Sequence, residues 1–186
     1  ADDAGERSDS MSEDVAGCFK YIPAEIVKIS TGSSHNYFII DKGYEEGIIE
    51  GAGVITGKGV VGVIDAVSRN FSYARSFQNF EMSISARLGK EGSAGPMSWN
   101  GKGGSKAILK EVPHHVEFHQ GDTVYTSGYS SIFPPDIPLG TAGEAKIVNG
   151  ATYEIDIMLF EDFGALRYVT VVENMGQDEI RNLENR

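Results

Sequence analysis

The sequence predicts an all-β protein that consists of two small six-stranded β-barrels or sandwiches lying side by side. Short runs of β-branched and aromatic residues recur along the chain, and several alternate between apolar and polar residues with a period of two. Glycine accounts for 23 of the 186 residues, well above the usual ~7%, which indicates many turns. No window shows a helical stripe longer than two turns. About twelve short strands separated by glycine turns are typical of sandwiches and small closed barrels.

The individual strands are visible in the spacing of apolar residues. The clearest covers residues 152–160, where Ile155 and Ile157 alternate with acidic residues, as in a strand with one face in the core. Residues 58–67, KGVVGVIDAV, are apolar at both odd and even positions, which predicts a strand covered on both faces. Further strands are expected at residues 24–30, 37–41, 71–77, 81–87, 106–112, 122–127, 140–148 and 167–172.

A glycine-rich stretch at residues 89–104 interrupts the strands near the middle of the chain. It holds six glycines and one proline, which is typical of a domain boundary or a long hairpin tip. We therefore predict two β-barrel domains, with exchange of strands between them left open. The predicted division is a flexible tail at 1–20, a first barrel domain at 21–98, a second at 99–174 and a C-terminal tail at 175–186.

The net charge of −11 argues against two classes of partner, nucleic acid and an anionic bilayer surface. Nucleic acid is held by clustered Lys and Arg, and an anionic bilayer surface attracts basic segments. The single cysteine, Cys18, leaves no intrachain disulfide. No apolar run approaches the ~18 residues of a membrane span, and the sequence does not start with a signal-peptide core. A membrane anchor or export signal, if the protein has one, is expected outside this sequence.

Two motifs in the sequence resemble one known family. Residues 41–64 contain Asp-Lys-Gly, Gly-Ile, a lone Gly, Val-Ile and Gly-Val-Val-Gly in that order, and VSRNFSYARSF follows at 67–77. Residues 121–140 read GDTVYTSGYSSIFPPDIPLG. Both stretches are similar to the MreC family of rod-shape-determining proteins, and the resemblance spans about residues 24–173. One departure is Asp136, which stands where the family usually has glycine; Asp tolerates the left-handed backbone region better than most residues.

The resemblance implies a function based on binding. It implies two barrels at the periplasmic, extracytoplasmic face of the cytoplasmic membrane, anchored by an N-terminal helix that this sequence lacks. It further implies a non-enzymatic scaffold that organises peptidoglycan synthases during cell-wall elongation. The implied partners are a class B penicillin-binding protein (the elongation transpeptidase), MreD and, indirectly, MreB. Self-association into a homodimer or a larger assembly is also implied, and no cofactor is expected.

The second motif predicts a stiff loop. Gly128 ends the preceding strand, and three prolines restrict the loop that follows. A preorganised loop loses little entropy on binding a partner. Ile132 and Phe133 either plug the end of a barrel or form an exposed anchor. The residues proposed to bind a partner are Tyr129, Ile132, Phe133, Pro134 and Pro135. The residues proposed for structural turns are Gly43, Gly47, Gly62, Gly121, Asp122, Gly128 and Gly140.

A chymotrypsin-like double-barrel serine protease is one alternative. His35, Asp65 and Ser127 occur in the order of that protease triad. A nucleophile in such a fold sits in a Gly-Asp-Ser-Gly-like turn beside oxyanion-hole amides, whereas Ser127 follows Tyr-Thr and precedes Gly at a predicted strand end. We therefore predict no catalytic residue.

A metal-binding β-protein is the second alternative. His114, His115 and His119 form a short histidine string, and a zinc site needs three or four such ligands around one ion. His115 and His119 have helical spacing, but Pro113 and the surrounding strands favour a loop. We therefore predict a solvated turn and no metal.

Overall fold

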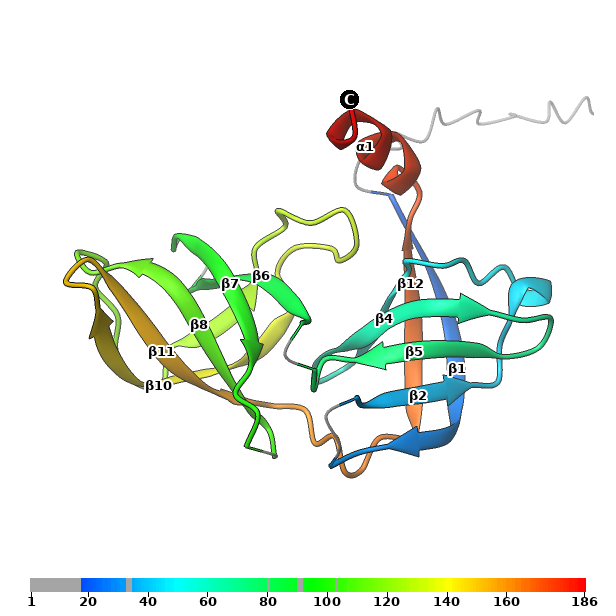
Figure 1. The fold of residues 1–186 in the computed structure, drawn as a ribbon, viewed down its shortest axis with the longest axis horizontal. Helices are drawn as coiled ribbons and strands as arrows, with labels where there is room; N and C mark the ends of the chain where they lie inside the picture. Colours follow the sequence, from blue (N-terminus) through cyan, green and yellow to red (C-terminus); the bar gives the residue numbers. More distant parts are fainter. Residues whose placement is uncertain (1–17, 33–34, 80, 90–91, 103) are drawn as a thin grey trace, which may run out of the picture.

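The computed structural model describes residues 18–32, 35–79, 81–89, 92–102 and 104–186. These residues form two closed antiparallel barrels of six strands each, followed by one short α-helix (Figure 1). The prediction of an all-β fold with two six-stranded barrels is confirmed. The strands are β1 (Phe19–Ser30), β2 (Tyr37–Ile40), β3 (Gly53–Thr56), β4 (Gly59–Val67), β5 (Ser72–Ser76), β6 (Ser83–Leu88), β7 (Ala94–Trp99), β8 (Lys106–Pro113), β9 (Thr123–Thr126), β10 (Pro138–Val148), β11 (Thr152–Leu159) and β12 (Tyr168–Asn174). The helices are the 3₁₀ turn η1 (Tyr44–Glu46) and α1 (Gln177–Glu184).

The first barrel joins the beginning of the described chain to its end. Its strand order is β1–β12–β3–β4–β5–β2, and β2 closes the barrel on β1. β12 pairs with the first half of β1, from Phe19 opposite Asn174 to Glu25 opposite Tyr168. The first barrel is therefore complete only after the rest of the chain has returned to it.

The second barrel is formed by the middle of the chain, in the order β10–β11–β8–β7–β6–β9. The predicted domain boundary after residue 98 falls inside β7, and both β6 and β7 pair within the second barrel. β12 lies in the predicted second domain but belongs to the first barrel. The chain therefore crosses between the barrels at the β5–β6 and β11–β12 connections.

Each barrel encloses its own core of side chains from alternating strand positions. Phe38 and Ile40 of β2 are fully buried in the first barrel, and Ile155 and Ile157 of β11 in the second. The alternation predicted for residues 152–160 is thereby confirmed, because Asp156 between these isoleucines is exposed and Glu154 before them is half-buried.

The strand β4 is covered on both faces, as the sequence predicts. Val60 and Val61 are neighbours with opposite side-chain directions, yet both are buried. The second barrel approaches the start of this strand, where a Cβ on Gly59 would lie 3.5 Å from the carbonyl oxygen of Pro138. One face of β4 thus packs into its own barrel, and the other face lies partly against the neighbouring barrel.

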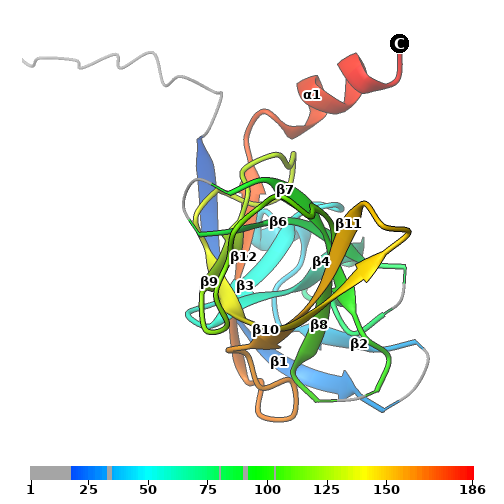
Figure 2. The same cartoon turned by 90° about the vertical axis from the view of Figure 1, so that its left-hand side faces the viewer.

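The ends of the described chain lie together on the first barrel. The predicted N-terminal tail is mostly outside the described residues, and its last two residues, Phe19 and Lys20, begin β1. The predicted C-terminal tail instead contains α1, on the same side of the barrels as the start of β1 (Figure 2). Gln177 donates from Nε2 to the carbonyl oxygen of Gly51 at 2.9 Å, which docks this helix on the first barrel. No described helix is long and apolar enough to span a bilayer.

Some of the residues predicted at turns do lie there. Gly47, Gly121 and Gly128 have φ angles of 88°, 94° and 85°, in the left-handed region that favours glycine. The carboxylate of Asp122 accepts a hydrogen bond of 2.8 Å from the backbone N–H of His119, which closes the turn before β9.

Other glycines predicted at turns have a different role. Gly62 and Gly140 lie inside β4 and β10 instead, where the backbone of the neighbouring strand occupies the space that a Cβ needs. Gly43 precedes η1 with an extended backbone, and the carbonyl of Ser68 likewise leaves no room for a side chain. At these three positions, close packing between backbones requires glycine.

Candidate interaction surface and the clasp between the barrels

The second motif forms a loop that connects the two barrels, here called the clasp loop (residues 127–137). It leaves the second barrel after β9, extends toward the first barrel and returns as β10 (Figure 1). Phe133 is only 4% exposed. Its ring lies over Gly53 of β3, so that a Cβ on Gly53 would be 2.8 Å from ring atom Cδ1. Phe133 is therefore neither a barrel plug nor an outward anchor in this chain, because it packs between the barrels.

The clasp loop is held in shape by its own hydrogen bonds. The Ser130 hydroxyl accepts from the N–H groups of Ile132 at 3.0 Å and Phe133 at 3.2 Å. The Thr126 hydroxyl donates to the carbonyl of Pro134 at 2.8 Å and accepts from the N–H of Ile137 at 2.9 Å. Satisfying these backbone groups inside the loop fixes the position of the Phe133 ring.

Two further contacts fix the start and the end of the clasp loop. Gly128 packs against Pro135, whose ring carbon would lie 2.8 Å from a Cβ at position 128. Asp136 has a φ of 68°, in the left-handed region, and forms an ion pair with Arg87 of β6. The same guanidinium donates to the carbonyl oxygen of Ser127 at 3.1 Å. Arg87 thereby joins both ends of the loop to the second barrel.

Two sets of hydrogen bonds also attach the barrels to each other. Asn174, at the end of β12, donates from Nδ2 to the carbonyl of Ser131 in the clasp loop at 3.0 Å. In the β11–β12 connection, the carboxylate of Glu161 accepts from the hydroxyl of Thr56 in the first barrel. The backbone carbonyl of the same glutamate accepts from the hydroxyl of Ser105 in the second barrel. Polar and apolar contacts together define how the barrels are oriented.

Of the five residues proposed to bind a partner, the structure leaves only some accessible. Tyr129 is 82% exposed, and Pro135 is exposed. Ile132 and Pro134 are half-buried, and Phe133 is buried. A partner that contacts this loop would therefore meet Tyr129 first.

The structure does not assemble the triad that the protease alternative requires. The Ser127 hydroxyl shares a hydrogen bond of 2.7 Å with the hydroxyl of Ser85. The carboxylate of Asp65 lies 3.7 Å from Nε of Arg75. His35 precedes β2 in the first barrel, whereas Ser127 begins the clasp loop of the second. Ser127 and Asp65 therefore each have a structural partner outside the triad.

The histidine string lies in the exposed connection after β8. Nδ1 of His114 lies 3.1 Å from the carbonyl oxygen of Ala151, and its ring meets that of His115 edge to face with centroids 6.4 Å apart. Within the described ranges, no group of three or more His, Cys, Asp or Glu side chains is arranged to hold a metal ion.

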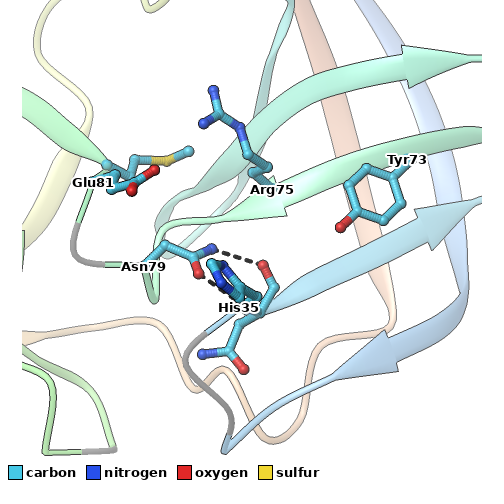
Figure 3. A pocket seen from close by; sticks show the side chains of 7 residues that line it. His35, Tyr73, Arg75, Asn79 and Glu81 are labelled. Atoms are coloured by element: carbon cyan, nitrogen blue, oxygen red, sulfur yellow. Dashed lines mark hydrogen bonds between the residues drawn. The ribbon is translucent and has the colours of Figure 1, made fainter.

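A surface hollow lies on the first barrel beside the β5–β6 connection (Figure 3). His35, Tyr73 and Arg75 line one part of it. At its edge, the Asn79 side chain accepts a hydrogen bond of 2.9 Å from the backbone N–H of Asn36 and donates one of 2.7 Å to the carbonyl oxygen of the same residue. The described residues that line the hollow include no serine, threonine or cysteine. Among the described lining residues the hollow therefore offers neither an aliphatic hydroxyl nor a thiol as a nucleophile.

Comparison with known proteins assigns this architecture to a family. The model of the family "Rod shape-determining protein MreC, barrel core" matches residues 26–173. The cell shape-determining protein MreC of Caulobacter vibrioides is 28% identical over 149 residues, which are 80% of this chain and 41% of that protein. The corresponding protein of Escherichia coli is 26% identical over 126 residues, 63% of this chain and 32% of its own length. This chain therefore spans less than half of these relatives.

Solved structures show the same fold. The crystal structure of MreC from Pseudomonas aeruginosa has a TM-score of 0.74 at 20% identity and covers 82% of this chain and 98% of that one. A complex between the penicillin-binding protein PBP2 and MreC from Helicobacter pylori has a TM-score of 0.68 at 16% identity. The match covers 84% of this chain and 98% of that one. Because the family model matches most of the residues from β1 to β12, this chain belongs to the MreC family of rod shape-determining proteins.

Proposed function

We propose that this chain is the extracytoplasmic scaffold region of the bacterial cell-wall elongation machinery and that it acts by binding a class B penicillin-binding protein. The observation that carries the proposal is the family membership, together with a similar structure that was solved as a complex of PBP2 with MreC. The hydrogen bond of Ser127 to Ser85 and the ion pair of Asp65 with Arg75 engage two of the triad candidates elsewhere, which supports binding rather than chemistry.

The clasp loop gives this scaffold a physical basis. Two barrels joined only by two connecting segments would move relative to each other, and binding a partner across both would then lose free energy to ordering. Phe133 over Gly53 and Asn174 on Ser131 hold the barrels before any partner arrives. A scaffold of fixed shape favours one conformation of a bound transpeptidase if it binds that conformation more tightly than others.

The wider context is part of the same proposal. We infer an anchored protein at the extracytoplasmic face of the cytoplasmic membrane, held by an N-terminal helix outside this sequence. MreD is a proposed partner within the membrane, and MreB is linked through the complex. Self-association into dimers or larger assemblies is proposed as well. Tyr129 is proposed as a contact residue of the clasp loop because it is 82% exposed.

A binding titration tests the proposal. The purified chain is titrated against the extracytoplasmic region of the class B penicillin-binding protein of the same bacterium, with a carboxypeptidase-type penicillin-binding protein as the specificity control. We expect saturable binding at micromolar concentration or tighter to the class B protein only. Equal binding to both proteins, or no saturable binding up to about 100 μM, would contradict the proposed function.

A further inference from the structure

The outer face of the second barrel carries a groove that the clasp loop does not cover. It crosses β8, β11 and β10, which are neighbours in the barrel and lie side by side in Figure 1. We name it the outer groove and define it by five of its side chains and one glycine. These are Lys102, Lys106, Ile108, Asp156 and Met158, with Gly143 as the gap among them.

The strand register explains why this part of the barrel is hollowed. Lys106 is opposite Met158, and Ile108 is opposite Asp156, so that the outward side chains of β8 and β11 form two successive cross-strand pairs, which are the two rows of the groove. On the other side of β11, the register with β10 shifts between Ala142 and Ala145. Gly143 falls in this irregular stretch and contributes no side chain, which leaves the groove open beside the two rows.

Three charged side chains of the outer groove are unpaired. Lys102 and Lys106 are exposed at one end, and Asp156 is exposed in the middle. Among the described residues, none of these three side chains forms a hydrogen bond or ion pair. The next pair of outward residues, Lys146 and Glu154, differs because the two side chains lie 3.6 Å apart and neutralise each other.

Two apolar side chains lie directly beside these charges. The outward residues of β11 are acidic at 154 and 156, but the next is Met158, which is 51% exposed. Ile108, one row away, is half-buried. Methionine is flexible and polarizable, and it is common at surfaces that receive a variable partner. The groove therefore presents an apolar floor with a basic end and an acidic side.

We propose that the outer groove binds an extended segment of the penicillin-binding partner, in which an acidic and a basic residue flank an apolar side chain. The acidic residue would lie at Lys102 and Lys106, the apolar side chain on Met158 and Ile108, and the basic residue at Asp156. This inference rests on the proposed function for the identity of the partner. The composition of the segment follows from the groove alone.

The spacing of the rows supports an extended segment rather than a helix. Successive outward residues of a strand are two positions apart, which corresponds to about 6.6 Å. An extended partner segment has the same repeat on the face that it presents, so two of its alternate side chains can meet the two rows of the groove in turn. Lys102 and Lys106 are exposed and have no acidic partner among the described residues, so an acidic residue of the partner can pair with them at this end.

Two substitutions in the groove and two matched controls test the inference against the same penicillin-binding protein. Lys106→Glu reverses the basic end, and Lys28→Glu, on exposed β1 of the first barrel, makes the same change in net charge elsewhere. Met158→Ser removes the apolar anchor, and Ile147→Ser removes a side chain of 60% exposure near the far end of β10. We expect each groove variant to bind at least ~10-fold more weakly and each control to stay within ~2-fold of wild type.

A second measurement does not depend on the stability of the variants. A photoreactive phenylalanine analogue at position 158 should crosslink to the penicillin-binding protein, and the same analogue at position 147 should not. Unchanged affinity of both groove variants with melting temperatures equal to wild type, or crosslinking only at 147, would overturn the inference. Loss of self-association with unchanged affinity for the penicillin-binding protein would assign the groove to a second copy and would also overturn it. Failure of the wild-type chain to bind would contradict the proposed function instead.

Discussion

Phe133 of the clasp loop lies directly over Gly53 of β3, in the space that a side chain at position 53 would occupy. The two residues come from different barrels and are far apart in the sequence. The Phe133 ring is 4% exposed, and it fits against the first barrel because Gly53 has no Cβ. This contact explains why a loop that belongs to the second barrel controls the position of the first.

Replacing Gly53 by Ala should force the Phe133 ring away from the first barrel. The new Cβ would lie 2.8 Å from ring atom Cδ1 and 3.0 Å from Cγ2 of Ile132. Overpacking of this kind typically costs about 1–3 kcal/mol, and each kcal/mol lowers the melting temperature by roughly 2–4 °C in a chain of this size. Gly57→Ala is the control, because a Cβ there meets nothing within 4 Å. Thermal unfolding followed by calorimetry measures both, and equal midpoints would refute the contact.

Phe133→Ala should lower stability through a cavity between the barrels. Truncation of a buried aromatic residue costs about 3–5 kcal/mol, whereas truncation of Tyr129, at 82% exposure, should change stability by no more than about 0.5 kcal/mol. Chemical denaturation gives both values.

The double variant Gly53→Ala with Phe133→Ala provides a sharper test of the same contact. The alanine at position 53 no longer meets a ring, so the combined loss in the free energy of unfolding should be smaller than the sum of the single losses. Strictly additive losses would show that the two residues do not interact in solution.

Gly128→Val should destabilise the clasp loop and the second barrel. The φ angle of 85° is an outlier for a β-branched residue, and the new side chain would also meet Pro135. We expect a loss of about 1–3 kcal/mol in the free energy of unfolding. Gly57→Val, in open space, should be close to neutral. A melting temperature of Gly128→Val equal to that of wild type would mean that this turn tolerates other residues.

Ser127 should not react with a fluorophosphonate. Its hydroxyl is hydrogen-bonded to Ser85 and the Asp65 carboxylate pairs with Arg75, so among the described residues neither group is engaged with the His–Asp relay that would activate a serine. Mass spectrometry of the treated chain measures the modification. Labelling of Ser127 that disappears in His35→Ala would support the protease alternative.

Much of the fold was accessible from local patterns in the sequence. The alternation around Ile155 and Ile157 and the two-sided apolar run around Val60 correspond to β11 and β4 as predicted. The spacing of apolar residues within a strand shows whether one or both of its faces are buried, so this property can be predicted from that strand's residues alone.

The pairing partners of the strands could not be predicted in the same way. The pairing of Phe19 with Asn174 joins residues from opposite ends of the described chain, and no local pattern encodes it. β7 was hidden by Gly95 and Pro96, residues that usually disfavour strands. The clasp loop was visible as a motif, but its contact with Gly53 depends on how two closed barrels lie together.

Cell-shape complementation tests most directly whether this protein acts by binding rather than by chemistry. Cells of the source bacterium that are depleted of the protein receive full-length versions with either His35→Ala and Asp65→Ala together or Lys106→Glu and Met158→Ser together. The account predicts rods from the first version and rounded cells from the second at equal protein levels. Rounded cells from the first version, with normal rods from the second, would contradict it.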